Sequence, residues 1–301
     1  MSDRRVALVA DPSQLEVVRA ISTSFGDVGI FNPTRSRFGE LSSPIFTDLE
    51  SLLRQFDPAL CCFLSPYTRM KQDLPTCIDR RVHVLSVGPF SMNRKEFELV
   101  SQKARDNRIH VQSNGRHLFS RLHDTVSERS GGSAFGHPVY LRLLTGGGDG
   151  ILSAWWAACE ALAQAESLLR SGVTDLRVTA IKKGRKHHVT LTVQMGDRAL
   201  AQLVIAPVYV PLGRDMTLLG TGGLLSNESI HNATMVIKEG GVELHSHEAF
   251  CPDPDWVKDF VRKIDRSDPE LPDWKTLSFQ GRVLRSIRQA LREGRPVRVK
   301  V

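Results

Sequence analysis

The chain has 301 residues, of which 41% are hydrophobic and 24% are charged, and its formal net charge is +7 at pH 7. This composition excludes a disordered chain and leaves room for two domains of ordinary size. No apolar stretch approaches the roughly 20 residues that cross a bilayer, and the charged start MSDRR leads straight into an apolar run. We therefore expect a cytoplasmic protein that does not enter a membrane.

The first part of the chain alternates short apolar runs with segments of helical periodicity. The apolar runs are VALVA, VGIF, ALCCFL, VHVLSV and IHVQS. Strands that alternate with helices in this way form βαβ units, which build a parallel sheet covered on both faces. Residues 1–125 are therefore predicted to form an α/β, Rossmann-like domain.

The second part of the chain carries longer strands that mostly follow one another directly. They are PVYLRLLT, DLRVTAIKK, HHVTLTVQM, ALAQLVIAPVYV, ATMVIKE and GVELHSH, with one long helix over about 151–170. Two helices, near 255–264 and 279–293, precede a last strand, PVRVKV. Residues 126–301 are predicted to form an α+β domain with a large open, mostly antiparallel sheet. A return of the closing helix and strand toward the first domain stays open.

The cysteines are not arranged as ligands or as a disulfide framework. Their number is odd and none of them forms a C-x-x-C pair: they are Cys61, Cys62, Cys77, Cys159 and Cys251. We interpret them as small buried hydrophobic residues.

Four stretches, in this order, resemble members of the Gfo/Idh/MocA family of oxidoreductases, which includes glucose-fructose oxidoreductase and inositol dehydrogenase. They are PIFTDLESLLRQFDPALCCFLSP, VHVLSVGPFSMNRKEFELVSQKARDNRIHVQSN, FGHPVYLRLL and RVLRSIRQALREGRPVRV. The resemblance covers nearly the whole chain. It implies a two-domain oxidoreductase fold that binds NAD or NADP and dimerises through the open sheet.

The first departure from this family lies in the loop after the first strand. Family members have a G-x-G-x-x-G loop there, because glycines let the backbone approach the pyrophosphate. The matching positions here are Ala10, Pro12 and Leu15. Instead, the sequence predicts a helix start with Asp11 as N-cap, Pro12 as first helical residue and Gln14 closing a capping box. Because the Asp11 carboxylate would also repel a phosphate, we expect no dinucleotide cofactor.

A cofactor bound in another pose remains the alternative. The residues that would contact NAD or NADP are then Asp11, Ser13, Asn32 and Arg35. Arg35 and Arg37 follow the second strand, where an arginine can bind the 2′-phosphate of NADP. A solvated polar turn explains these two arginines equally well.

The second and third departures remove the family's catalytic side chains. The family's fourth strand ends in Glu-Lys-Pro, and this chain has Val87, Gly88 and Pro89 there. Glycine has no titratable group and cannot transfer a proton. The family's histidine on the long helix is missing too, since residues 141–186 contain no histidine and Glu160 is the acid nearest that place. We therefore assign no catalytic residue.

Candidate ligand-binding residues follow the strands of the first domain, because open α/β sheets bind ligands beyond the carboxyl ends of their strands. They are Tyr67, Arg69, Asn114, Arg116 and His117, joined by Trp155 on the long helix. Such a set suits a polar or aromatic small molecule or a peptide. Alternatively, Trp155 and Trp156 simply pack the long helix on the sheet, as paired aromatic residues often do.

Two further patterns have plain explanations. Glu243, His245 and His247 share one face of a strand and are weak candidates for a metal site, but alternating polar residues are typical of any half-exposed strand. We therefore expect no metal. The arginine run from Arg282 to Arg298 accompanies no nucleic-acid motif, so a nucleic-acid partner is not expected.

The sequence thus predicts a non-redox binding or accessory protein on an oxidoreductase fold, a pseudoenzyme that holds a small molecule or peptide in an interdomain cleft and forms a homodimer through the open sheet. Two alternatives stay open. One is an active NAD(P)-dependent oxidoreductase. The other is a non-redox enzyme, a cyclase or dehydratase, with a relocated acid and base.

Overall fold

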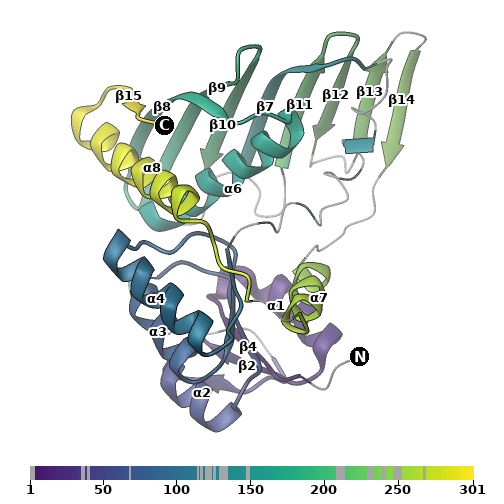
Figure 1. The fold of residues 1–301 in the computed structure, drawn as a ribbon. Coiled ribbons are helices and arrows are strands. Elements are labelled where there is room, and N and C mark those ends of the chain that lie inside the picture. The colour runs from purple at the N-terminus through teal and green to yellow at the C-terminus, as the bar shows by residue number, and fades with distance from the viewer. Residues whose placement is uncertain are drawn as a thin grey trace. The chain divides into compact units, whose positions relative to one another are not determined.

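The chain forms two compact units, which Figure 1 draws as ribbons. The computed structural model describes residues 4–34, 38, 41–67, 69–113, 115, 118, 124, 127–128, 135–146, 150–207, 214–228, 233–238, 241–246, 253–266 and 269–301. One unit comprises Met1–Arg116 with Cys251–Ser278, and the other comprises His117–Phe250 with Phe279–Val301. The segment that returns to the first unit is therefore 251–278, whereas the last strand of the chain belongs to the second unit.

The first unit is built on a six-stranded sheet in which every described pair of strands is parallel. Its strand order is β3-β2-β1-β4-β5-β6. The strands are β1 (Val6–Val9), β2 (Val28–Phe31), β3 (Ile45–Phe46), β4 (Leu60–Phe63), β5 (His83–Ser86) and β6 (Val111–Ser113). All residues of β1, β2 and β4 are buried, as the continuous apolar runs predict for strands covered on both faces. The Rossmann-like prediction is confirmed.

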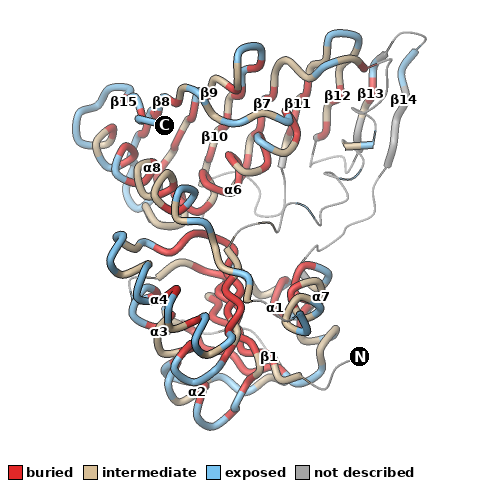
Figure 2. The backbone as a smooth tube through the Cα atoms, viewed as in Figure 1, coloured by how far each residue is buried: buried red, intermediate tan, exposed pale blue. Residues whose placement is uncertain are grey.

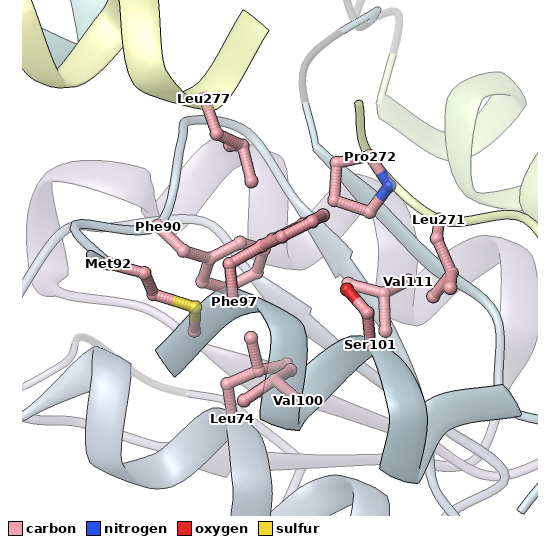
Figure 3. A pocket seen from close by; sticks show the side chains of 10 residues that line it. All are labelled: Leu74, Phe90, Met92, Phe97, Val100, Ser101, Val111, Leu271, Pro272 and Leu277. Carbon is pink, nitrogen blue, oxygen red and sulfur yellow. The ribbon is translucent and has the colours of Figure 1, made fainter. Parts of the chain in front are cut away.

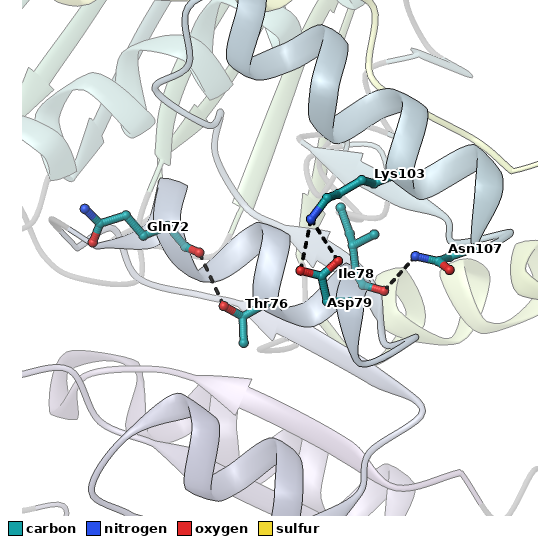
Figure 4. Close-up of polar contacts among 6 residues, drawn as sticks. All are labelled: Gln72, Thr76, Ile78, Asp79, Lys103 and Asn107. Atoms are coloured by element: carbon teal, nitrogen blue, oxygen red, sulfur yellow. Dashed lines mark hydrogen bonds and ion pairs between the residues drawn. The ribbon is translucent and has the colours of Figure 1, made fainter.

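Two helices of this unit begin at side chains that accept hydrogen bonds from their free backbone amides. The elements are a 3-10 turn, η1 (Pro12–Gln14), and the helices α1 (Leu15–Phe25), α2 (Leu49–Phe56), α3 (Met70–Asp79), α4 (Arg94–Asp106) and α7 (Asp253–Ile264). Asp48 caps α2, and Asn93 with Glu96 forms a complete capping box on α4. Lys103 of α4 pairs with Asp79 of α3 at 3.0 and 3.1 Å, and Asn107 donates to the Ile78 carbonyl (Figure 4).

The second unit is built on a nine-stranded sheet of order β14-β13-β12-β11-β7-β10-β9-β8-β15. The strands are β7 (Pro138–Gly146), β8 (Val173–Lys183), β9 (Lys186–Met195), β10 (Ala199–Ala206), β11 (Arg214–Gly220), β12 (Gly223–Glu228), β13 (Ala233–Lys238), β14 (Gly241–Ser246) and β15 (Val297–Val299). β7 and β10 pair in parallel, and the other described pairs are antiparallel. The mostly antiparallel sheet that the sequence predicts is therefore confirmed.

One face of this second sheet carries the core. Helix α6 (Ile151–Leu169) contacts β7, β9 and β10, and α8 (Trp274–Glu293) lies on the same side of the sheet in Figure 1. Burial alternates along β8, β9 and β10, because successive side chains of a strand point to opposite faces. Figure 2 shows the same alternation of red with tan and blue. The other face is open over the described strands.

Candidate functional site

The carboxyl edge of the parallel sheet is the place to look for a ligand in the first unit. β1 lies between β2 and β4, so the chain order reverses beside it, and ligands of open α/β sheets bind at such a switch point. Asp11 lies after β1, Asn32 after β2 and Ser65 after β4, while Gly88 follows β5.

The loop after β1 is closed by its own aspartate. Asp11 is the N-cap of η1, with one carboxylate oxygen accepting the Ser13 N–H at 2.8 Å and also the Ser13 hydroxyl. The predicted N-cap and the place of Pro12 are confirmed. The predicted capping box is wrong, because Asp11 N–H donates to the Ser65 hydroxyl at 3.3 Å and not to Gln14. The turn is also 3-10 rather than α-helical, and α1 begins at Leu15.

The helix start therefore offers no free backbone donor in positions 12–15. Pro12 has no N–H, and the Ser13 N–H is held by the Asp11 carboxylate. The Gln14 N–H donates to the Asp11 carbonyl at 3.0 Å, and the Leu15 N–H donates to the Pro12 carbonyl. A pyrophosphate at a helix N-terminus needs these donors. These residues do not fit a dinucleotide in the pose that Rossmann-like sheets use.

The side chain of Asn32, which follows β2, stabilises the turn that comes directly after it. It is 5% exposed, and its carbonyl oxygen accepts the N–H and the hydroxyl of Thr34 at 3.0 and 2.8 Å. This is an Asx turn around Pro33. Arg35 and Arg37, the candidate contacts of a 2′-phosphate, lie outside the described residues.

Tyr67 and Arg69 meet at a carboxylate that the sequence analysis did not select. The Tyr67 hydroxyl donates to Asp73 Oδ2 at 2.5 Å, and the Arg69 guanidinium lies 3.9 Å from Asp73 Oδ1. Burial raises the pKa of Tyr67, and the hydrogen bond to Asp73 raises it further, so the phenol stays protonated. The spacing of Arg69 and Asp73, one helical turn apart, was the signal available in the sequence.

The Tyr67 ring completes an aromatic layer over this edge of the sheet. It stacks on Phe63 with ring centres 6.2 Å apart and meets Phe31 edge-on at 5.9 Å. Phe90, after β5, meets Phe63 edge-on at 6.2 Å. The layer spans the ends of β2 and β4 on either side of β1. Tyr67 is therefore held by packing as well as by its hydrogen bond, and Arg69, whose side chain is 72% exposed, is the polar group of this pair that faces solvent.

Gly88, which the resemblance matches to a lysine of the Gfo/Idh/MocA family, has no titratable side chain. Gly88 follows β5, and its carbonyl accepts the hydroxyl of Ser86, which is fully buried, at 2.7 Å. Val87 N–H donates to the Phe63 carbonyl at 3.0 Å. These hydrogen bonds fix the residues after β5 to β5 itself and to β4. Neither Val87 nor Gly88 has a side chain that can give or take a proton.

Trp155 has a structural role in the second unit. Its side chain is 2% exposed, and its indole N–H donates to the Gln280 carbonyl of α8 at 2.8 Å. The packing alternative therefore describes Trp155, and its hydrogen-bond partner lies on helix α8. Asn114, Arg116 and His117, the remaining ligand candidates, lie outside the described residues.

The residues that the structure describes contain no group of three His, Cys, Asp or Glu side chains placed to hold a metal. His247 lies outside the described residues, and the side chains of Glu243 and His245 on β14 are likewise not described. No helix in the described ranges is long and apolar enough to cross a membrane.

An apolar cavity of about 10 Å³ lies in the first unit (Figure 3). Its lining comes from α3, α4, β6 and the segments around Phe90 and Pro272. This volume holds at most one water molecule, and the lining is almost wholly apolar. The cavity is a packing gap and not a ligand site.

Comparisons with known proteins bear on the fold. No protein-family profile matches the sequence, and no curated protein is significantly similar to it. Solved structures match over nearly the whole chain. An NAD-binding oxidoreductase from Klebsiella pneumoniae is 15% identical, with both chains covered fully and a TM-score of 0.66. The UDP-N-acetylglucosamine 3-dehydrogenase of Acidithiobacillus ferrooxidans is 16% identical, with 97% and 99% covered and a TM-score of 0.71.

A third structure, an oxidoreductase from Agrobacterium radiobacter in complex with NAD+, L-tartaric acid and magnesium, is 11% identical, with 98% of each chain covered and a TM-score of 0.72. Identities this low speak to the fold alone. The chain has the two-domain fold of NAD-binding oxidoreductases of the Gfo/Idh/MocA type.

Proposed function

We propose that this protein is a non-redox binding or accessory protein that has kept an oxidoreductase fold. The observation that carries the proposal is the helix start at residues 12–15, where every backbone N–H is either absent or already hydrogen-bonded within the chain. A dinucleotide would have to break the Asp11 cap and then bind beside its carboxylate. Both steps oppose binding.

The end of β5 supports the same proposal. A hydride-transfer enzyme needs a group that gives or takes a proton beside the nicotinamide, and by the resemblance of the sequence Gly88 matches the lysine of the Gfo/Idh/MocA family. The buried Ser86 hydroxyl is engaged with the Gly88 carbonyl. The edge of the sheet is thus closed by local hydrogen bonds at two of its strands.

The proposed ligand is a polar or aromatic small molecule or a peptide at the carboxyl edge of the parallel sheet. Arg69 offers an exposed guanidinium beside the aromatic layer of Phe31, Phe63 and Tyr67. Guanidinium groups bind carboxylates and phosphates through paired hydrogen bonds. Arg116 and His117 remain proposed contacts on sequence grounds.

Fluorescence titration with NADH and with NADPH tests the proposal. We expect no saturable signal up to about 1 mM of either, because the first-turn amides are occupied. Saturation in the micromolar range would overturn the proposal. It would favour an active NAD(P)-dependent oxidoreductase, the function that the fold alone suggests, and a change in absorbance at 340 nm with candidate sugars would then identify the reaction.

We also propose that two copies pair through the open face of the second sheet. Strand register aligns an apolar row across six neighbouring strands on that face. The row consists of Leu200, Tyr140, Leu219, Leu224, Ile237 and Val242. Leu200, Ile237 and Val242 are among the large apolar side chains that are most exposed in the described chain. A continuous apolar row of this kind marks an interaction surface.

Light scattering after size exclusion tests the pairing. We expect a mass of twice 33.5 kDa for the protein and a monomer for the double variant Leu200→Lys, Ile237→Lys. Ile181→Lys is the matched control, because Ile181 is 64% exposed in the same sheet but lies outside the row. A monomeric protein, or a double variant that still dimerises, would contradict this proposal.

A further inference from the structure

A second, basic region occupies the opposite end of the same open face, where β15, β8 and β9 lie side by side. Burial alternates along β8, with Leu176, Val178 and Ala180 buried, so Arg177 and Lys183 point to the open face. Lys186 of β9 and Arg298 of β15 are exposed as well and lie opposite these two residues. We call Arg177, Lys183, Lys186 and Arg298 the basic strip.

The strip contains two pairs of like charges directly across from each other. Arg177 is the register partner of Arg298, and Lys183 is the register partner of Lys186. Like charges in directly opposed positions of an antiparallel pair destabilise a sheet. The fold therefore carries a local electrostatic cost where Lys183 faces Lys186, and a bound anion would relieve it.

Few carboxylates offset this charge. Asp175 pairs with Arg298 at 2.6 Å and lies 4.0 Å from Arg177. Lys183 and Lys186 form no ion pair with any residue that the structure describes. They flank a two-residue hairpin turn in which Gly184 has φ +62°, so the tight turn places the two lysines opposite each other at the tip. Arg185, exposed in the turn itself, adds a further cation.

The chemistry of the surroundings points to one class of partner. Thr179, Thr190 and Thr192 lie between the cations, and Ile181 is the one exposed large apolar side chain on β8, β9 and β15. A protein interface needs an apolar centre, and membrane-surface elements bury several apolar side chains. A phosphate backbone needs neither, because its binding is dominated by charge and by the release of counterions.

We propose that the basic strip binds the phosphate backbone of double-stranded nucleic acid without reading its sequence. Arg177 and Lys183 lie six residues apart on β8, which corresponds to roughly 20 Å along a strand, so the strip can meet several successive phosphates. The hydroxyls of the intervening threonines add hydrogen-bond donors to phosphate oxygens. The strip lies on β9, β8 and β15 and the apolar row on the other six strands of the sheet, so the two share no residue.

Fluorescence anisotropy with a labelled 20-base-pair duplex, measured between about 30 and 200 mM salt, tests the proposal. We expect binding that weakens steeply with salt. The triple variant Arg177→Gln, Lys183→Gln, Lys186→Gln should lower the affinity about 30-fold or more at low salt and reduce the slope of log K against log salt by about 2 to 3. Scrambling the duplex sequence should change little.

The matched control removes the same charge from another surface of the same unit. Arg285→Gln, Arg288→Gln, Arg292→Gln alters three exposed residues of α8 and should leave the affinity within about twofold. Equal losses in both triple variants would show that net charge alone drives binding and would overturn the proposal. So would the absence of duplex binding at low salt, or binding to vesicles of anionic lipid in preference to the duplex.

Discussion

Asp11 determines how the first helix begins and what that helix can bind. Its carboxylate supplies the acceptor that a bound phosphate supplies in a dinucleotide-binding sheet, and it comes from the chain itself. Asp11 is therefore a helix cap, and its carboxylate stabilises the start of the first helix. Removing that carboxylate should cost stability.

Removal of the Asp11 carboxylate tests the cap directly. The variant Asp11→Ala should lower the free energy of unfolding by about 1 kcal/mol, because the Ser13 N–H loses its acceptor. Urea denaturation measures the difference. Asp27→Ala, which removes an exposed aspartate without a described side-chain partner, is the control and should change stability by less than about 0.5 kcal/mol. A smaller effect at Asp11 than at Asp27 would contradict the account of the cap.

Two histidines join the returning segment to the first sheet. His83 Nδ1 accepts the His110 N–H and His110 Nδ1 accepts the Glu270 N–H, each at 3.1 Å. Nδ1 of each ring must therefore carry no proton. The pKa of His83 is lowered to about 4, chiefly by burial and also by the neighbouring His110 and Arg4, while Asp265 acts in the opposite direction. Burial also lowers the pKa of His110, although the nearby Glu270 opposes this.

These shifts predict an acid-sensitive fold. A folded pKa below the ordinary value of 6.5 means that the unfolded chain binds the proton first, so this stability is present above pH 6.5 and is lost as the pH falls toward 4. The melting temperature should drop over this range. His83→Asn keeps an acceptor that cannot be protonated and should flatten the drop, whereas His188→Asn, on the second sheet, should not. An unchanged pH profile in His83→Asn would exclude the mechanism.

At the scale of elements, the small cavity between α3, α4 and β6 is a place where packing can be improved. Val111→Ile adds one methyl group to a residue that lines the cavity. It should raise the free energy of unfolding by about 0.5 to 1 kcal/mol, as for one buried methylene. Val84→Ile is the control, because Val84 is fully buried on β5 and does not line the cavity. There the added methyl group overpacks the core and should lower the free energy of unfolding by about 1 kcal/mol or more. Equal effects of both changes would contradict this description of the cavity.

Elements with strong local signals could be predicted from the sequence, and contacts between distant segments could not. Apolar runs separated by helical periods predict the parallel sheet, and Asp11 followed by Pro12 predicts the helix start. The partner of the Asp11 N–H is Ser65, 54 residues away, and the partner of the Trp155 indole is Gln280, 125 residues away. Nothing local in the sequence encodes such pairs. Asp73 was missed because its role depends on burial beside Tyr67.

The basic strip could not be predicted from the sequence either, because its residues come from distant segments. The sequence displays the arginine run at the end of the chain, but the residues of the strip come from segments that are about 120 positions apart, and only strand pairing places Arg298 opposite Arg177. The run from Arg282 to Arg298 alone therefore does not reveal the basic strip, which strand register brings together. The proposed nucleic-acid contact therefore uses the open face of the second sheet and not the arginines of α8.

At the scale of the whole molecule, the chain enters each of its two units twice. Segment 251–278 returns to the first unit, where α7 packs on α1 and the Glu270 carbonyl accepts the Val111 N–H at 2.8 Å. This segment covers the last strand of the parallel sheet, whose edge would otherwise be free to pair with another chain. The chain therefore has the complete two-domain fold of NAD-binding oxidoreductases, while the backbone N–H groups at the helix start after β1 are hydrogen-bonded within the chain.

The amide signal of Ser13 in a nuclear magnetic resonance titration tests this central claim most directly, because the Asp11 carboxylate holds that N–H. With deuterated, ¹⁵N-labelled protein and NADPH or NADH added to about 1 mM, we expect the Ser13 signal to stay in place. In the variant Asp11→Ala the Ser13 N–H has no carboxylate acceptor, so its signal should move when NADPH or NADH is added. Saturable displacement of the Ser13 signal in the unaltered protein would contradict the account and return the chain to the dinucleotide-binding enzymes whose fold it shares.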